Sequence, residues 1–128
     1  MTNYMNWIEK ARIFIEVCEE DIAKGRYWLA CFHAQQAAEL YLKGVLVKLV
    51  GSFPFTHSLV ELLEALENIG YKIPEKIYLY ASSLEGHYSR ARYPGLEIGG
   101  YSRHIAERCL EHAKKITFFA EKILEGQS

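Results

Sequence analysis

Apolar residues recur every three or four positions along most of this chain, which is the period of an α-helix that buries one face. Five segments carry the pattern, and glycine or proline residues separate them. The segments span approximately residues 6–24, 26–50, 58–69, 74–92 and 105–123. No segment shows the alternation of apolar and polar residues that indicates a half-buried β-strand. Because the connections are short, we predict an all-α, up-and-down antiparallel bundle of about five helices.

The segment 26–50 is the most apolar of the five, so we expect it at the centre of the bundle. It also carries a polar strip, made of His33, Gln35, Gln36, Glu39 and Lys43. On a helix that is otherwise apolar, such a strip is expected to face a groove or a partner. Glu39 and Lys43 have in addition the i,i+4 spacing of a salt bridge.

Capping signals mark the starts of two helices. Asn6 with Glu9, and Ser58 with Glu61, have the spacing of a capping box, in which each side chain satisfies a free backbone N–H. An earlier start of the first helix stays open. Gly25 is placed to end the first helix, because glycine adopts the left-handed cap conformation without strain.

The length of 128 residues corresponds to a single domain, residues 1–128. Fifteen basic and sixteen acidic residues give a net charge of −1. This balance argues against coating nucleic acid through bulk charge and leaves a local basic patch open. The N-terminus lacks the features of a signal peptide, and the apolar stretch 27–32 is far shorter than the roughly 20 residues of a membrane span. We expect a cytoplasmic protein that does not enter a membrane.

The three cysteines, Cys18, Cys31 and Cys109, are far apart and form no CxxC motif. Their spacing gives no support to a zinc ribbon or a thioredoxin-like site. Each lies among apolar neighbours, so we interpret all three as small, reduced core residues.

Several kinds of chemistry have no motif here. The Glu-x-x-His of di-iron bundles, the zinc-binding HExxH, the GxSxG elbow and the Walker phosphate loop are all missing. Asp21 is the only aspartate, which argues against paired-aspartate catalysis. We therefore expect neither a cofactor nor a metal.

Positive charge is concentrated in residues 86–108. Four arginines stand there against two glutamates, with histidines and tyrosines between them. The arginines are Arg90, Arg92, Arg103 and Arg108. Arginine and tyrosine suit a phosphate-bearing ligand or a nucleic-acid strand, and they also suit a protein interface. The remaining alternative is a solvated helix end with salt bridges such as Arg103 to Glu107.

His33 has two interpretations. It is either a hydrogen-bonded histidine of a groove or a residue that contacts a ligand and transfers protons, because imidazole titrates near physiological pH. His57 directly precedes a helix cap and is interpreted as structural.

Three stretches together resemble a known family. The sequence QQAAELYLK at residues 35–43 is similar to the QQAxE-x-x-LK signature of HEPN (higher eukaryotes and prokaryotes nucleotide-binding) domains. His57-Ser58-Leu59 resembles the H-x-L that opens their next helix, and Ala91-Arg92-Tyr93-Pro94 resembles their ARYP segment. The resemblance spans about Met5 to Leu124 and implies a bundle of about five α-helices.

The resemblance also implies partners. HEPN proteins often act beside a minimal nucleotidyltransferase in two-component systems of toxin–antitoxin type, and they commonly form homodimers. Some are proposed to bind nucleotides, and others are metal-independent ribonucleases. The ribonuclease branch carries Arg, four to six residues and then His near the last helix.

This chain departs from the ribonuclease pattern. Three residues separate Arg108 from His112, and eight separate Arg103 from His112. Arg26 and His33 have the required six residues between them, but they lie in the second predicted helix.

Two functional hypotheses follow. The first is a non-catalytic, homodimeric binding module that associates with a nucleotidyltransferase and holds a nucleotide or RNA phosphate through His33, Gln36, Lys43, Arg90, Arg92 and Tyr93. The second is metal-independent RNA cleavage, for which the candidates are Arg92, Arg103 and His104, with arginine stabilising the phosphate and histidine moving the proton. A third alternative is a purely structural dimer.

Overall fold

The structure, a computed structural model, describes residues 3–90 and 100–126, and its regular elements there are all helical. Five helices have ten or more residues, and a sixth, α5, is a single turn of four. The helices are α1 (Tyr4–Ala23), α2 (Tyr27–Val50), α3 (Leu59–Asn68), α4 (Glu75–Glu85), α5 (His87–Arg90) and α6 (Arg103–Glu125). The prediction of an all-α bundle of about five helices is confirmed.

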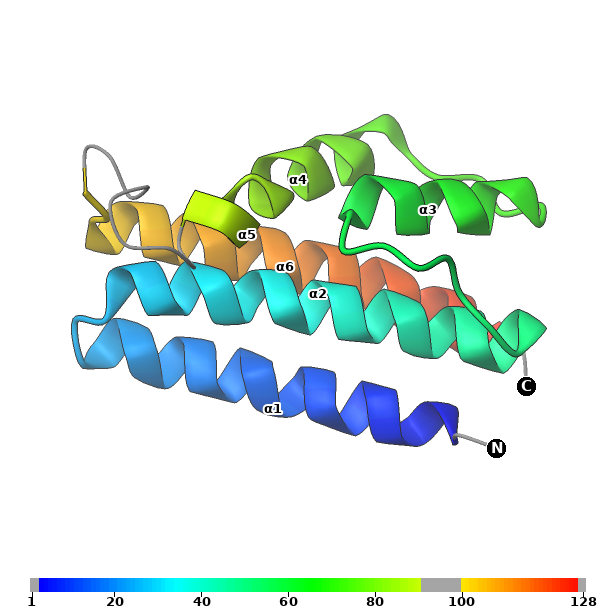
Figure 1. The fold of residues 1–128 in the computed structure, drawn as a ribbon, viewed down its shortest axis with the longest axis horizontal. Helices are drawn as coiled ribbons and strands as arrows, with labels where there is room; N and C mark the ends of the chain where they lie inside the picture. The colour runs from blue at the N-terminus through cyan, green and yellow to red at the C-terminus, as the bar shows by residue number, and fades with distance from the viewer. Residues whose placement is uncertain (1–2, 91–99, 127–128) are drawn as a thin grey trace.

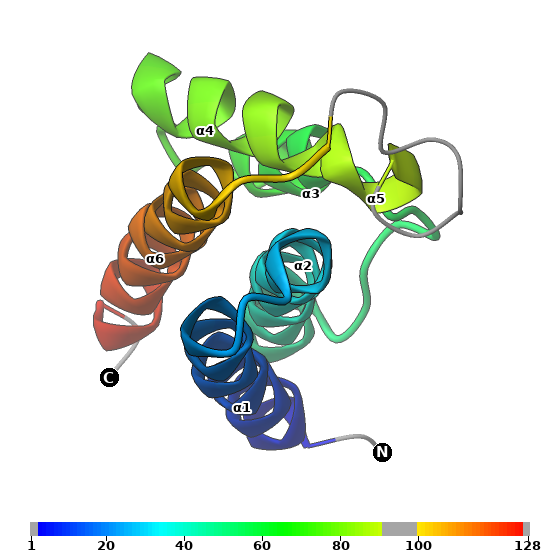
Figure 2. The ribbon, with the colours of Figure 1, turned by 90° about the vertical axis from the view of Figure 1, so that its left-hand side faces the viewer.

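The central position of α2 is also confirmed. Helices α1 and α6 run along two sides of α2, and the shorter α3, α4 and α5 cover its remaining side (Figures 1 and 2). Every other helix contacts α2, and α1 and α6 do so over most of their lengths. The alanine and leucine side chains of α2 are buried against these neighbours, and buried apolar area is the dominant favourable term in folding.

The caps explain where the helices begin. The side chain of Asn3 accepts a hydrogen bond from the backbone N–H of Met5, so α1 begins before the predicted Asn6. The Ser58 hydroxyl accepts from the N–H of Glu61, as the capping-box spacing predicted. Ser102 caps α6 in the same way.

The predicted helix 74–92 is divided in two. Helix α4 ends at Glu85, and α5 begins at His87 after Gly86. The Glu85 carboxylate accepts hydrogen bonds from the Ser58 hydroxyl and the Val60 N–H, which anchors the end of α4 to the start of α3. A tertiary contact of this kind cannot be recognised from a helical period.

All three cysteines are buried, as predicted. The expectation that all three are reduced is wrong for one pair, because Cys31 and Cys109 form a disulfide. Packing of α2 against α6 brings their Cα atoms to 5.2 Å, within the range that a disulfide spans. The two residues are 78 positions apart in sequence, so no local motif announces the pair.

Among residues 3–90 and 100–126, no helix combines the length and the apolar content that crossing a membrane requires.

Candidate functional site

A buried carboxylate lies where α1 ends and α2 begins. Asp21 is fully buried, and its two oxygens bind different partners. Oδ1 accepts from Arg26 Nε at 3.0 Å and lies 2.9 Å from a terminal guanidinium nitrogen of the same residue. Oδ2 lies 2.6 Å from His33 Nδ1. We call Asp21, Arg26 and His33 the Asp21 cluster.

The turn between α1 and α2 positions this cluster. Gly25 adopts a φ of +76°, which reverses the chain, and the Arg26 N–H then donates to the Asp21 carbonyl oxygen at 2.8 Å. Helix α2 therefore starts beside the last turn of α1. His33, two turns along α2, faces Asp21 and stacks on the Phe14 ring with 5.4 Å between ring centroids.

The Asp21 cluster combines a fixed imidazole with a guanidinium. An ionised carboxylate only accepts hydrogen bonds, so Nδ1–H of His33 is the donor, and Nε2 is the ring nitrogen that does not bond Asp21. The His33 side chain is 16% exposed and that of Arg26 is 43% exposed. The arrangement can therefore transfer a proton at Nε2 beside a guanidinium that reaches solvent.

Further basic groups gather at the same end of the bundle, where α2 and α6 both begin (Figure 2). The Arg103 guanidinium lies 6.0 Å from the centroid of the Tyr27 ring and 3.8 Å from Glu107. Arg108 lies 2.9 Å from His104 Nε2, one turn further along α6. We call this surface the basic end; its residues are Arg26, Tyr27, Arg103, His104 and Arg108.

Most side chains of the predicted polar strip form hydrogen bonds with other groups inside the protein. Glu39 accepts from Lys43 Nζ at 2.8 Å and from Gln35 Nε2 at 3.1 Å, and it lies 3.0 Å from His57 Nδ1. Gln36 donates to the side-chain oxygen of Gln35 at 2.7 Å. The i,i+4 ion pair of Glu39 and Lys43 is therefore confirmed.

The expectation that this strip faces a groove or a partner is wrong for three of its members. Gln35, Glu39 and Lys43 are buried. The segment between α2 and α3 covers them, because Gln35 also donates to the His57 carbonyl oxygen and Lys43 lies over the Phe53 ring. Their polar groups satisfy one another, which removes the cost of burying them.

The other predicted site residues are distributed as follows. Arg90 lies in α5, which contacts α2, whereas Arg92 and Tyr93 fall outside the described residues. His33 and Lys43 are ten residues apart on one helix, about 15 Å along its axis at 1.5 Å per residue. The structure thus places His33 near the basic end and Lys43 away from it.

Sequence analysis missed the role of Asp21. This residue lies on the apolar face of α1, next to the buried Cys18 and Ile22. A single charged residue on a buried face was one available signal, since such a group needs partners. The six-residue spacing of Arg26 and His33 was the other, because both bind this carboxylate.

The family model for the HEPN domain matches residues 4–123. This chain belongs to the HEPN domain family. The match covers nearly the whole HEPN chain and confirms the resemblance carried by residues 35–43 and 57–59.

Solved structures agree with this membership. The protein TT1696 from Thermus thermophilus is 34% identical, with a TM-score of 0.88, over 96% of this chain and 99% of its own. A HEPN domain protein from Thermotoga maritima is 30% identical, with a TM-score of 0.78, over 94% and 98%. An archaeal HEPN homologue is 29% identical, with a TM-score of 0.80, over 96% and 99%. No curated protein sequence matches the chain.

Proposed function

We propose that this HEPN chain is a cytoplasmic binding module that pairs with a minimal nucleotidyltransferase and holds a nucleotide or RNA phosphate at its basic end. The observation that carries the proposal is the exposed Arg103 of α6 lying over the ring of Tyr27, which directly follows Arg26 at the N-cap of α2. A guanidinium fork matches phosphate oxygens, and an aromatic face stacks on a base. His33 borders this surface through Arg26, with which it shares Asp21.

The predicted ligand residues contribute unequally to this proposal. Arg90, Arg92 and Tyr93 follow α4 and precede α6, and we assign them to the ligand together with the basic end. Gln36 and Lys43 already bind Gln35 and Glu39, so their part is to support α2.

Titration with nucleotides and short RNA tests the binding proposal. Arg103→Ala is expected to weaken binding about tenfold, because a hydrogen bond to a charged group contributes about 1.5 kcal/mol. For RNA it should also reduce the slope of log K against log salt by about one. Arg12→Ala is the matched control, since both side chains are 55% exposed and each has one loose ion pair, at 3.9 Å for Arg12 and 3.8 Å for Arg103. Equal losses in the two variants would contradict a site at the basic end.

The partner is tested separately. Co-expression with a minimal nucleotidyltransferase is expected to yield a complex that stays together through size-exclusion chromatography. Elution of the two proteins as independent species would contradict the pairing and leave the phosphate site unaffected.

The proposed homodimer has a candidate surface on the other side of the bundle. An open groove of about 960 Å³ lies between α1, α4 and α6, with Ile15, Ile77, Tyr80, Phe118 and Phe119 among its lining residues. Phe118 is 60% exposed. Aromatic side chains are enriched at protein interfaces, so an exposed phenylalanine in this groove supports a dimer contact here. Phe118→Ser is expected to raise the dimer dissociation constant in sedimentation equilibrium, and an unchanged value would exclude this face.

The Asp21 cluster favours a second candidate function, metal-independent RNA cleavage. In that reaction His33 Nε2 takes the proton of a 2′-hydroxyl, the 2′-oxygen bonds to phosphorus, and the 5′-oxygen leaves with a proton from a second acid. Arg26 stabilises the additional negative charge on the phosphate. Asp21 fixes the ring orientation and stabilises the imidazolium.

An RNA-cleavage assay with a chelator present distinguishes the two functions. If the chain is a ribonuclease of this kind, His33→Asn abolishes cleavage while His112→Asn does not, because His112 stacks on Tyr80 away from the cluster. His104→Ala tests the alternative set chosen from the sequence, in which His104 moves the proton and Arg92 and Arg103 stabilise the phosphate. Loss of cleavage in this variant would favour that set. Absence of cleavage by the unmodified protein favours the binding module.

A further inference from the structure

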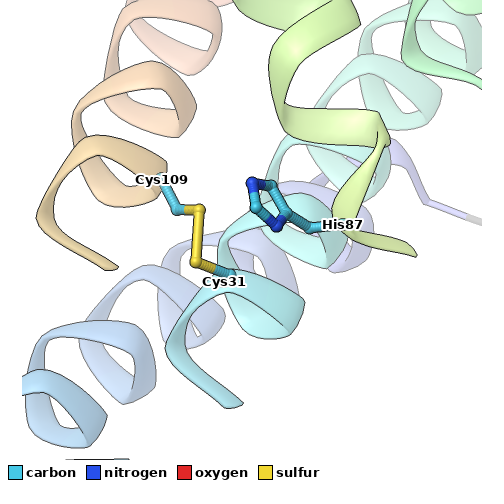
Figure 3. A group of neighbouring side chains, drawn as sticks. All are labelled: Cys31, His87 and Cys109. Carbon is cyan, nitrogen blue, oxygen red and sulfur yellow. A yellow bond between two sulfur atoms is a disulfide. The ribbon is translucent and has the colours of Figure 1, made fainter. Parts of the chain in front are cut away.

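Two cysteines and a histidine meet between three helices. Cys31 lies in α2, Cys109 in α6 and His87 at the start of α5, and their candidate ligand atoms all lie within 4.8 Å of one another. Both cysteines are buried and His87 is half-buried. Figure 3 shows the imidazole ring beside the two sulfurs. Cys31, His87 and Cys109 were not among the ligand-binding or ribonuclease residues predicted from the sequence.

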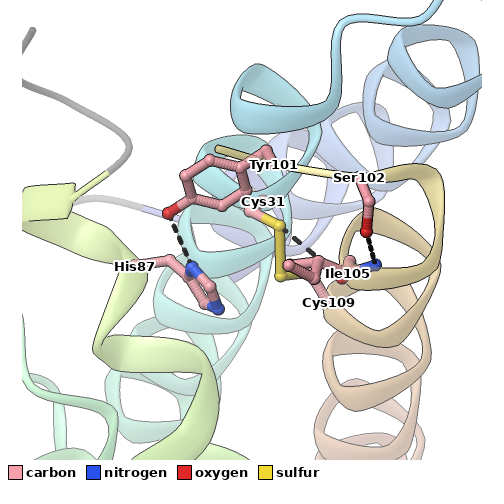
Figure 4. Close-up of a disulfide and its surroundings, with 6 residues drawn as sticks. All are labelled: Cys31, His87, Tyr101, Ser102, Ile105 and Cys109. Carbon is pink, nitrogen blue, oxygen red and sulfur yellow. Dashed lines mark hydrogen bonds between the residues drawn. A yellow bond between two sulfur atoms is a disulfide. The ribbon is translucent and has the colours of Figure 1, made fainter. Parts of the chain in front are cut away.

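His87 is oriented by a second residue. Its Nδ1 lies 2.8 Å from the hydroxyl of Tyr101, just before α6 (Figure 4). Metal-ligating histidines almost always bond one ring nitrogen to an oxygen in this way, which fixes the tautomer and leaves the other nitrogen for the ion. A disulfide by itself requires no such third group.

We propose that Cys31, Cys109 and His87 form a redox-controlled metal site. The oxidised protein holds the disulfide, and the reduced protein binds one divalent ion of the zinc class through both thiolates and His87 Nε2. Two sulfurs and one nitrogen are a zinc-type donor set, with ligand distances of about 2.3 Å and 2.0 Å, and water completes the tetrahedron. Rotation about each Cα–Cβ bond separates the sulfurs to admit the ion.

The disulfide is converted to the metal site by reduction followed by binding of the ion. A dithiol reductant delivers two electrons and two protons, the Cys31–Cys109 S–S bond breaks, and the reductant becomes a disulfide. The ion then forms two bonds to sulfur and releases two protons to water. The metal keeps its oxidation state throughout. The disulfide links α2 to α6, whereas the ion would link α2, α5 and α6.

Thiol counting tests the oxidised state. Full-length protein purified in air and denatured without reductant is expected to show one free thiol, that of Cys18, and three after reduction. Three free thiols before reduction would overturn the oxidised half of the proposal.

Titration with Co²⁺ tests the reduced state. Protein reduced with a dithiol and desalted without oxygen should bind one Co²⁺, with thiolate-to-metal charge-transfer bands and the intense ligand-field bands of a four-coordinate ion. Zn²⁺ should displace the Co²⁺, and the oxidised protein should show no such bands. Absence of charge-transfer bands in the reduced protein would overturn the metal site.

Variants identify the histidine ligand. His87→Gln is expected to weaken Co²⁺ binding by more than about tenfold and to change the ligand-field bands, while thiol counting still detects the disulfide. Tyr101→Phe should weaken binding by about tenfold, the usual effect of losing a residue that orients a ligand. His104→Gln is the control and should bind as the unmodified protein does. Identical Co²⁺ affinity and spectra in His87→Gln would exclude this histidine from the site.

Discussion

Asp21 and His33 are twelve residues apart in sequence and lie on different helices, yet Oδ2 of one is 2.6 Å from Nδ1 of the other. The second carboxylate oxygen binds Arg26 at the start of α2. A single buried charge therefore fastens the end of α1 to the first two turns of α2. The same contact fixes the histidine ring beside the basic end.

Asp21→Asn is expected to lower the free energy of unfolding by about 2–4 kcal/mol. The substitution keeps the volume of the side chain and removes its charge, so Arg26 and His33 lose their anionic partner in a buried position. Urea denaturation measures the change. Glu19→Gln is the control, because Glu19 is about half-exposed and pairs with Lys114 on the surface, where such pairs contribute at most about 1 kcal/mol. Equal stability of Asp21→Asn and the unmodified protein would contradict this account.

Two ion pairs have the same sequence spacing but differ in burial, so a comparison of them measures the effect of burial on stability. Glu39–Lys43 and Glu20–Lys24 are both i,i+4 pairs, at 2.8 and 3.0 Å, and only the first is buried. Glu39→Gln is expected to lower the free energy of unfolding by about 3 kcal/mol, because Lys43 remains buried without a carboxylate. Glu20→Gln should cause no measurable change. Urea denaturation of both variants gives the comparison, and similar effects would show that burial is not decisive.

The helices could be predicted because their signals are local. The leucines of α3 recur with the helical period, and Ser58 caps that helix as its spacing predicts. The start of α1 stayed open between Asn6 and an earlier residue, because Asn3 and Asn6 carry the same capping group and local chemistry does not distinguish them. The break at Gly86 depends on Glu85 bonding to α3, a contact between helices.

The candidate site could be predicted only where its partners are neighbours on one helix. Glu39 and Lys43 are four residues apart, and their pairing was predicted correctly. The partners of Asp21 lie beyond a turn, and those of Cys31 lie on other helices. Such pairs depend on how the helices pack, which helical periodicity does not specify.

The buried Cys18 thiol makes stability sensitive to alkaline pH. Burial, with the nearby negative charges of Asp21 and Glu19, raises its pKa from 9.0 to about 12. Between pH 9 and 12 the unfolded chain releases a proton that the native protein keeps. The contribution of Cys18 to the free energy of unfolding is therefore fully present below pH 9 and is lost as the pH rises. The loss approaches about 1.4 kcal/mol per pH unit for this one group.

Urea denaturation between pH 8 and 11 measures this dependence. Cys18→Ala removes the titrating thiol, so its stability should fall less steeply above pH 9, whatever its stability at pH 8. Tyr78 supplies an internal reference, because its pKa is also raised to about 12 and it is present in both proteins. Parallel pH profiles for the two proteins would show that Cys18 does not cause the loss.

Gly44 allows α1 and α2 to approach closely. A Cβ atom at this position would lie 2.9 Å from the Trp7 Cβ and 2.9 Å from the end of the Ile8 side chain. Alanine favours a helix over glycine by about 1 kcal/mol, but overpacking typically costs about 1–3 kcal/mol. Because the Trp7 Cβ is fixed to the backbone of α1, relieving the contact requires the helices to move apart. Gly44→Ala is therefore expected to lower the free energy of unfolding by about 1–2 kcal/mol.

Gly86→Ala is the matched control for the Gly44 prediction. Gly86 has a φ of −60°, and a Cβ there would meet the carbonyl oxygens of Ser83 and Ser82 at 3.6 and 4.0 Å, which are ordinary contacts. This substitution should leave stability unchanged or raise it by about 0.5 kcal/mol, because alanine restricts the unfolded chain. Thermal and urea denaturation of both variants measure the difference. If Gly44→Ala were as stable as Gly86→Ala, the close contact between α1 and α2 would not limit the side chain at this position.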